Sequence, residues 1–260
     1  MVSPCVLASH RSRPAGFYRL LPRKVKLMYS ASTVVRPYSV SLQTIEALPF
    51  RIRLVSSPQD LAKAVEIRSS AYSRHVETVG RALREAESDD FREDVLLMIA
   101  ERKADGRALG SVRMQPNLAQ PLRIERETRL PALFDGRRLM EFMRLGVENG
   151  APGRLVTAAL VKAGYEIAFA SGIDFVLVAG RQSVSKMYRS MCFDDVLQGG
   201  TVPLSYADCL PHGIYCMPIE DADRRWREAN HSLYGFMART SHPDIAIDYE
   251  RVFRVFGARA

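Results

Sequence analysis

The segment EFMRLGVENGAPGRLV, residues 141–156, constrains the fold of this 260-residue chain most strongly. Its first half continues an apolar, strand-like stretch, yet it carries Glu141 and Arg144. A loop rich in glycine and proline follows, and an amphipathic helix begins at Arg154. Burying a carboxylate or a guanidinium group is costly unless the group is paired or used. The segment therefore predicts a strand, a loop and a helix that hold charged side chains at a functional site.

The elements around this segment interleave helices with strands. Ser57 and Pro58 are typical of the N-cap and first position of a helix, and Asp105-Gly106 is typical of a hairpin turn. We expect strands at 51–55, 95–101, 108–116, 139–147, 173–180 and 213–219, and helices at 57–72, 154–171 and 183–193. This order predicts an α/β or α+β fold with a central mixed sheet flanked by helices.

The net charge of +8 is concentrated at the N-terminus. Residues 1–50 contain seven basic residues and one acidic residue, and they are rich in Ser and Pro without sustained periodicity. We interpret 1–50 as a basic arm that is either disordered or precedes the true start, and such an arm alone does not indicate nucleic-acid binding. Residues 51–220 are predicted to form the main domain, and 221–260 a C-terminal helical extension packed on it.

Two further features bear on cellular context and chemistry. No apolar stretch approaches the ~20 residues of a membrane span, and the N-terminus lacks the pattern of a secretion signal. The sequence therefore predicts a cytoplasmic protein without a membrane span. The four cysteines form no C-x-x-C pair and have no His partners at zinc spacing, so no metal site is predicted.

Three motifs, in this element order, resemble those of a known superfamily. Tyr188 and Phe193 fit a Tyr-x-x-x-Gly-Phe pattern at the end of a late helix, although Cys192 replaces the glycine. G-S-V-R-M-Q-P follows the hairpin, and E-x-x-R-L-x-V lies on the next strand. Together they resemble the Gcn5-related acyltransferase (GNAT) fold. Within it, the chain resembles the acyl-homoserine lactone (autoinducer) synthases and, more closely, the long-chain N-acyl amino acid synthases, over roughly residues 51–220.

This resemblance implies a set of site residues. Amide synthesis from a thioester needs a base for the amine, donors for the carbonyl oxygen and an acid for the leaving thiolate. The implied base is Glu141 and the implied acid is Tyr188. The arginines expected to bind an acceptor carboxylate are Arg68, Arg113 and Arg144. The backbone positions expected to hold the acyl donor and its oxyanion are Gly146, Val147, Gly150 and Gly153. The acidic stretch that resembles the synthases' paired aspartates contains Asp89, Asp90, Glu93 and Asp94.

Structural roles remain open for the same residues. Three positions apart on a regular strand, Glu141 and Arg144 point to opposite faces, so they share a site only if a β-bulge intervenes. Otherwise they form structural ion pairs with neighbouring elements. Arg68 is predicted to lie on the buried face of its helix, from which it could also extend to a surface carboxylate. Arg113 could face solvent on an edge hairpin, and Tyr188 could be an ordinary core residue.

The loop at 147–155 bears on the acyl donor. In CoA-dependent members of the fold this loop usually begins with Gln or Arg and cradles a pyrophosphate on backbone N–H groups. Here Glu148 adds repulsion toward phosphate and Pro152 removes one N–H donor. We therefore expect the phosphopantetheine arm of an acyl carrier protein as the donor, and no tightly bound cofactor. The residues expected to meet the acidic carrier are Arg154, Lys162, Arg126, Arg129, Arg137 and Arg138. The alternative is acyl-CoA bound by Gly150 and Gly153 in a shifted register.

The sequence thus predicts an N-acyltransferase that moves a long fatty acyl chain from a carrier-protein thioester to the amino group of an amino acid. Contact with a membrane would be peripheral, through the lipid product. Three alternatives stay open: an acyl-homoserine lactone synthase, an acetyl-CoA-dependent N-acetyltransferase and a non-catalytic module that binds acyl thioesters.

Overall fold

The structure is a computed structural model that describes residues 44–259, and these residues belong to one compact unit. The greater part of the predicted basic arm, residues 1–43, lies outside the described residues. Leu48 and Phe50 are buried in the main core, at 3% and 2% exposure. The domain therefore begins before residue 51, which corrects the predicted boundary, because the first apolar side chains of the sheet precede the strand-like pattern.

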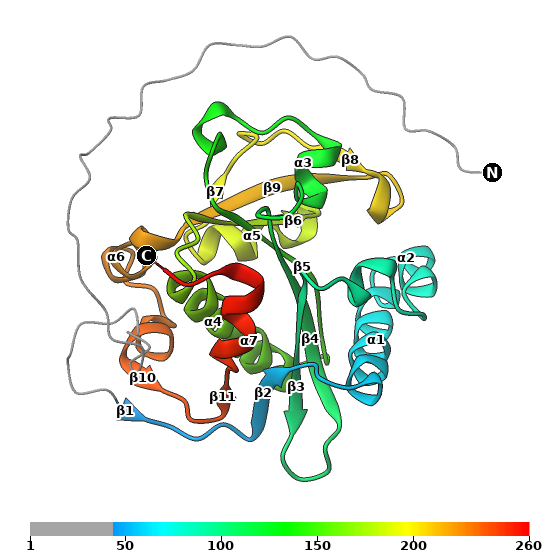
Figure 1. Ribbon diagram of the computed structural model, residues 1–260, viewed down its shortest axis with the longest axis vertical. Helices are drawn as coiled ribbons and strands as arrows, with labels where there is room; N and C mark the ends of the chain where they lie inside the picture. Colours follow the sequence, from blue (N-terminus) through cyan, green and yellow to red (C-terminus); the bar gives the residue numbers. More distant parts are fainter. Residues whose placement is uncertain (1–43, 260) are drawn as a thin grey trace. The chain divides into compact units, whose positions relative to one another are not determined.

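Helices and strands alternate along the described chain (Figure 1). The helices are α1 (Pro58–Ser73), α2 (Glu77–Ala82), α3 (Arg123–Glu127), α4 (Ala151–Ala170), α5 (Gln182–Ser190), α6 (Ala222–Glu228) and α7 (Tyr249–Phe256). The short helical turns are η1 (Ser88–Phe91), η2 (Ala132–Phe134), η3 (Ser205–Ala207), η4 (Ile219–Asp221) and η5 (Gly235–Arg239). The strands are β1 (Thr44–Ile45), β2 (Phe50–Leu54), β3 (Leu96–Arg102), β4 (Ala108–Pro116), β5 (Leu139–Val147), β6 (Phe175–Gly180), β7 (Asp194–Asp195), β8 (Val202–Leu204), β9 (Leu210–Pro218), β10 (Thr240–Ser241) and β11 (Ile245–Ala246).

The main sheet has the strand order β11-β2-β3-β4-β5-β6-β9-β7, with β8 on β9. Strands β2 to β5 are antiparallel, β5 and β6 are parallel, and β6 and β9 are antiparallel, which confirms the predicted mixed sheet. The register joins β5 to β6 only at Leu139–Glu141. Beyond Glu141, no described strand pairs with β5 on its β6 side, so the two strands part at this residue.

Two long helices cover opposite faces of the sheet. Ala64 of α1 packs in a cluster with Leu97 and Ile99 of β3, whereas α4 packs on the face that holds Met98. Ser57 caps α1 as predicted, because its hydroxyl accepts a hydrogen bond from the Asp60 N–H.

Gly146 explains why α1 lies directly on β5. A Cβ atom at this position would be 2.9 Å from the Cα of Arg68. Only glycine permits this approach, and it brings Arg68 onto the sheet. Arg68 is 1% exposed, which confirms its predicted place on the buried face of the helix.

The C-terminal residues pack into the main core. Trp226 of α6 is 3% exposed, and Phe256 of α7 is fully buried in the same cluster as the sheet. Strand β11 adds a parallel edge strand beside β2. The predicted boundary at residue 220 therefore does not divide the structure, because apolar side chains on both sides of it share one core.

Candidate active site where β5 and β6 part

A β-bulge in β5 brings Arg144 to the site of Glu141. Ser111 of β4 faces Gly146, and Arg113 faces Met143, so Arg144 and Leu145 lie opposite a single residue of β4. Arg144 has φ = 56°, a left-handed conformation that is unusual for a residue with a side chain. The bulge rotates the following side chains relative to a regular strand. The β-bulge that Glu141 and Arg144 need in order to share a site is therefore present.

Glu141 is a buried carboxyl with only neutral hydrogen-bond donors. It is 1% exposed, and its Oε2 accepts a bond of 3.1 Å from the Ile124 N–H of α3. The Tyr206 hydroxyl of η3 donates to Oε1 at 3.3 Å. Loss of hydration raises the pKa of Glu141 to about 7. The hydrogen bond from the Ile124 N–H and the nearby charge of Arg123 lower this pKa, but their effect is smaller than that of burial. A carboxyl with this pKa is suited to take a proton near neutral pH.

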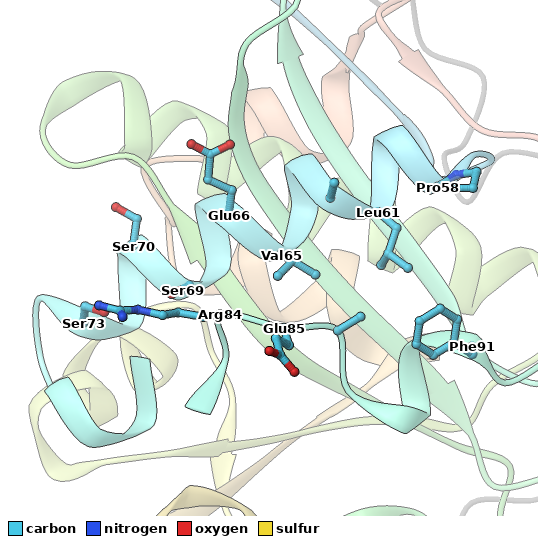
Figure 2. Close-up of a pocket in the computed structure, with 12 residues that line it drawn as sticks. Pro58, Leu61, Val65, Glu66, Ser69, Ser70, Ser73, Arg84, Glu85 and Phe91 are labelled. Atoms are coloured by element: carbon cyan, nitrogen blue, oxygen red, sulfur yellow. The ribbon is translucent and has the colours of Figure 1, made fainter. Parts of the chain in front are cut away.

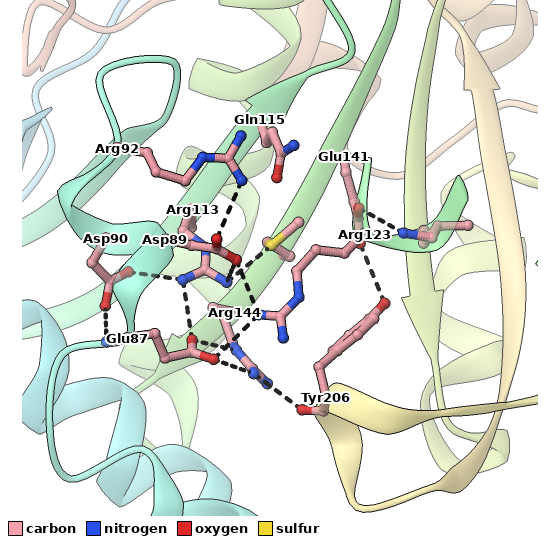
Figure 3. Close-up of polar contacts among 12 residues, drawn as sticks. Glu87, Asp89, Asp90, Arg92, Arg113, Gln115, Arg123, Glu141, Arg144 and Tyr206 are labelled. Atoms are coloured by element: carbon pink, nitrogen blue, oxygen red, sulfur yellow. Dashed lines mark hydrogen bonds and ion pairs between the residues drawn. The ribbon is translucent and has the colours of Figure 1, made fainter. Parts of the chain in front are cut away.

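Carboxylates of this chain pair with the predicted arginines, and Figure 3 shows Arg113 and Arg144 beside Glu87, Asp89 and Asp90. Asp90 of η1 receives both Nη groups of Arg68, at 3.0 and 2.8 Å, and Nη1 of Arg113 at 2.9 Å. The Asp90 side chain is 0% exposed. Arg68 and Arg113 thus meet at Asp90, and Arg113 does not face solvent. Whether either one binds substrate stays a prediction, because Asp90 already holds both.

Glu87 holds Arg144 in a bidentate pair. Its carboxylate accepts from Arg144 Nε at 2.8 Å and from Nη2 at 2.6 Å. Burial alone would raise the pKa of Glu87, but the bonds and charge of Arg144 lower it to about 2. Arg144 also donates to the Tyr206 carbonyl at 3.1 Å. Glu141 and Arg144 are thus linked through Tyr206 rather than by an ion pair with each other.

Three residues of this site were not identified from the sequence: Glu87, Arg123 and Tyr206. The Arg123 guanidinium lies 4.3 Å above the Tyr206 ring, and its Nη1 contacts Glu87 and Asp89 at 3.2 Å each. An open polar pocket of about 450 Å³ lies beside it, lined by Glu87, Ser88, Asp89, Arg123, Arg126 and Glu127. The charged run at 123–127 was the available signal, whereas no pattern marks Tyr206.

The acidic stretch is only partly engaged in this cluster. Asp89 and Asp90 contact the arginines. Asp94 instead pairs with Arg92 at 2.6 Å, and Glu93 is exposed. The carboxylates that join the arginines are therefore Glu87, Asp89 and Asp90.

Tyr188 of α5 lies on the opposite face of the sheet from Glu141. Its ring stacks on Tyr215 of β9, with centroids 5.3 Å apart, and contacts Phe193. Burial raises the pKa of the Tyr188 hydroxyl, so the hydroxyl keeps its proton at neutral pH. The packing is that of a core residue, and the role of Tyr188 as an acid stays a prediction.

A narrow apolar cavity adjoins Tyr188 on this face. Leu145, Tyr188, Ile219 and Trp226 are among the residues that line it. None of its lining residues is charged, and its volume is about 30 Å³. Three methionines, Met140, Met191 and Met217, contribute to the walls. Because methionine side chains adapt their shape readily, the cavity can widen around an inserted chain.

The turn before α4 differs from its predicted form. Helix α4 begins at Ala151 rather than Arg154, because Pro152 is well tolerated in the first turn. Gly150 has φ = 85°, and a Cβ on Gly153 would lie 1.8 Å from the Glu148 carbonyl oxygen. That oxygen therefore occupies the space over the first turn of the helix. Arg107 pairs with the Glu148 side chain.

Basic residues proposed to meet a carrier protein differ in exposure. Arg126, Arg129 and Arg154 are exposed. Lys162 is 1% exposed, and its ammonium group donates to the carbonyl oxygens of Phe236 and Thr240. The prediction for Lys162 is wrong, because the segment that follows α6 covers it.

A second, open groove of about 750 Å³ lies between α1 and residues 84–91 (Figure 2). Leu61, Val65 and Phe91 line it together with Glu66 and Glu85. Glu141 and the arginine cluster do not contribute to its lining, so this groove is separate from the candidate site.

Within residues 44–259, no group of three or more His, Cys, Asp or Glu side chains is placed to hold a metal ion. No helix in this range combines the length and apolar character needed to cross a membrane.

Comparison with known proteins places these features in a family. A protein-family model described as N-acyl amino acid synthase FeeM matches residues 63–206. The matched region contains Glu141, Tyr188, Tyr206 and the arginine cluster. No match was found among curated proteins.

Two solved structures share the fold. FeeM, an N-acyl amino acid synthase from uncultured soil microbes, is 15% identical with a TM-score of 0.55, over 72% of this chain and 98% of that chain. BjaI, a CoA-dependent acyl-homoserine lactone synthase with bound SAM and isopentyl-CoA, is 18% identical with a TM-score of 0.51, over 79% and 98%. They confirm the predicted acyltransferase fold. Because the family model spans more than half of the chain, the protein belongs to the FeeM family of N-acyl amino acid synthases, which are acyltransferases.

Proposed function

We propose that the protein transfers a long acyl chain from the thioester of an acyl carrier protein to the amino group of an amino acid, with Glu141 as the base. The observation that carries this proposal is the environment of Glu141. Its buried carboxyl has a pKa raised to about 7 by desolvation, and it lies where β5 and β6 part. The polar pocket of Arg123 adjoins one face of the sheet and the apolar cavity adjoins the other.

The proposed reaction forms an amide bond and breaks a thioester bond. Glu141 accepts the proton of the incoming ammonium group, directly or through one water molecule. The amine attacks the carbonyl carbon, and backbone N–H groups near Gly146 and Val147 stabilise the developing oxyanion. The C–S bond then breaks, and the sulfur takes a proton from Tyr188. The attacking nitrogen loses its second proton, which returns to Tyr188 through water, and Glu141 gives its own proton to solvent before the next turnover.

The acceptor carboxylate is proposed to bind Arg123 at the polar pocket. Arg68 and Arg113 are held by Asp90, and Arg144 is held by Glu87, so these three would orient the carboxylates of η1 around the acceptor. Arg123 uses Nη1 for Glu87 and Asp89, and its side chain is 19% exposed. A guanidinium group with its other edge toward an open pocket suits bidentate binding of a carboxylate.

Replacing Arg123 by Gln should raise KM for the amino acid about tenfold or more and change kcat much less. The physical reason is the loss of a charge-assisted pair that binds substrate and transition state alike. Steady-state kinetics with a saturating acyl donor measures this. The matched control is Arg227→Gln, which removes an exposed arginine of α6 far from the pocket in sequence. An unchanged KM in Arg123→Gln would return the carboxylate site to Arg68, Arg113 or Arg144.

The preference for a carrier-protein donor is supported by the turn before α4. The Glu148 carbonyl oxygen lies over the first turn, where it would oppose a pyrophosphate, and Arg154 is exposed nearby for an acidic carrier. Acyl-CoA is the second candidate, since BjaI, which shares the fold, is CoA-dependent.

Long-chain acyl carrier protein should therefore give a higher kcat/KM than the matching acyl-CoA at low ionic strength. The advantage should shrink with added salt, because salt screens attraction between exposed charges. Kinetics with both donors at two salt concentrations measures this. Equal use of the two donors at low salt would favour CoA.

The proposed function is tested with purified protein, acyl carrier proteins of several chain lengths and a mixture of amino acids. Mass spectrometry should detect N-acyl amino acids, and a thiol reagent should detect an equal amount of released phosphopantetheine thiol. Products from acetyl-CoA alone would identify an N-acetyltransferase, and a lactone product would identify a homoserine lactone synthase. Binding of acyl thioester without thiol release would contradict catalysis.

A further inference from the structure

The apolar cavity is lined in part by a side chain from outside the family match, Trp226. The family model ends at residue 206, whereas Trp226 lies on α6. The indole is 3% exposed and contacts Tyr165 edge-to-face, with centroids 4.9 Å apart. Its Nε1–H donates to the Met191 carbonyl at 3.1 Å. The indole is thus fixed in position by packing on one side and a hydrogen bond on the other.

The strand register gives the cavity a direction. Met140 pairs with Val176 in the part where β5 and β6 are still joined, and Leu145 lies beyond the bulge. Ile219 follows β9, and its N–H donates to the Asp174 carbonyl at the start of β6. The wall from Leu145 to Met140 is six residues long and includes the extra residue of the bulge, so it spans about 13 Å at the usual rise of a strand. A chain that enters beside Leu145 and Tyr188 therefore runs toward Ile219 and Trp226.

Segments near the indole hold α6 in place. Arg225 pairs with Asp194 at 2.8 Å and donates to the Cys192 carbonyl at 3.3 Å. The helix is therefore attached to the segment that follows α5, which itself lines the cavity through Met191 and Phe193. Methionine walls can adapt along the length of the cavity, but its end is a rigid aromatic ring fixed at two points.

We propose that Trp226 sets the upper limit on acyl-chain length by ending the channel that receives the acyl tail. The inference rests on the proposed function, because it requires the acyl chain to occupy this cavity. A chain short enough to stop at the indole buries all its methylene groups. A longer chain must displace the ring or leave methylene groups outside the cavity.

The test compares kcat/KM for carrier-protein donors of increasing chain length in wild type, Trp226→Leu and Trp226→Ala. Each additional buried methylene contributes roughly fourfold to kcat/KM. The quantity compared is the ratio of kcat/KM for a donor two carbons beyond the wild-type optimum to kcat/KM at that optimum. We expect both variants to raise this ratio by about 15-fold, fourfold for each of the two methylenes. Phe256→Leu is the matched control, because Phe256 lies in the same core but does not line the cavity. Its length profile should equal that of wild type.

A substitution of opposite sign keeps the proposal testable if the Trp226 variants fold poorly. Val176→Phe adds volume at the same end of the cavity, so it should shorten the optimum by at least two carbons. An unchanged length profile in active Trp226→Leu or Val176→Phe protein would overturn the inference and leave the proposed function standing. A wild-type protein that transfers no acyl chain of any length would instead contradict the proposed function itself.

Discussion

Glu141→Gln should lower kcat by about 100-fold or more while the protein remains folded, since general bases typically contribute 10²–10⁴-fold. The amide can still accept a hydrogen bond from the Ile124 N–H but cannot take the proton of the amine. Single-turnover kinetics with acyl carrier protein and amino acid measures the chemical step. Glu228→Gln, an exposed carboxyl of α6, is the control. Activity of Glu141→Gln within twofold of wild type would make Glu141 a structural residue.

The same carboxyl predicts how activity depends on pH. The base must be deprotonated, and burial raises the pKa of Glu141 to about 7. The rate of wild type should therefore fall about tenfold per pH unit below that value and level off above it. A profile that stays flat from pH 5 to 8 would contradict this assignment.

The pH dependence of stability that Glu141 causes has the opposite sign to that caused by an ion-paired carboxylate. The folded pKa of Glu141 is about 7 against an ordinary 4.5, so the folded state holds the proton more tightly than the unfolded state. Stability from this group is therefore present below pH 4.5 and lost as pH rises toward 7, by about 3 kcal/mol. Glu141→Gln should have a higher free energy of unfolding than wild type above pH 7. The difference between the two proteins should be smaller at pH 5. Urea unfolding at both values measures the difference.

Asp90→Asn should lower the free energy of unfolding by about 3–5 kcal/mol, the usual cost of removing one partner from a buried ion pair. The fully buried Asp90 carboxylate accepts from Arg68, Arg113 and the Glu87 N–H. Asparagine would leave the two buried guanidinium groups short of negative charge. Urea unfolding monitored by circular dichroism measures the loss.

Asp105→Asn is the control for this substitution. Asp105 pairs with Arg102 in an exposed turn, and exposed pairs contribute little. We expect its free energy of unfolding to change by less than about 1 kcal/mol. If Asp90→Asn also changed stability by so little, the cluster would be held together by its other pairs.

The loss of stability at acidic pH follows from the same cluster of arginines and carboxylates. Arg144 lowers the pKa of Glu87 from 4.5 to about 2, more than offsetting the effect of burial. A carboxylate with a lowered folded pKa stabilises the protein fully above its ordinary pKa, and this contribution is lost as pH falls toward 2. Protonation of Glu87 and Asp90 at low pH should thus release η1 from the arginines.

Several features of this protein follow from the sequence alone because they depend on neighbours along the chain. The Ser57 cap is set within four residues, and the Asp105-Gly106 turn needs only a glycine that accepts φ = 69°. Helical periodicity places Arg68 on the buried face. Gly172, at φ = 64°, follows the end of α4, a position where glycine is common. The resemblance in motif order, extending to Glu141 and Tyr188, was sufficient to identify the family.

Tertiary structure decided how the charges are paired. Glu87 meets Arg144 across 57 positions, and Tyr206 meets Glu141 across 65, so no local pattern encodes either contact. The bulge at Arg144 depends on the register against β4, and one residue of slip reverses the face of every side chain that follows. Lys162 follows the spacing of an exposed helical lysine, but a segment some 75 residues later covers it and supplies carbonyl oxygens. The sequence determines which groups are present and on which face each element carries them. Packing between distant segments determines which of these groups lose water and which partners replace it, and that exchange sets the pKa of Glu141.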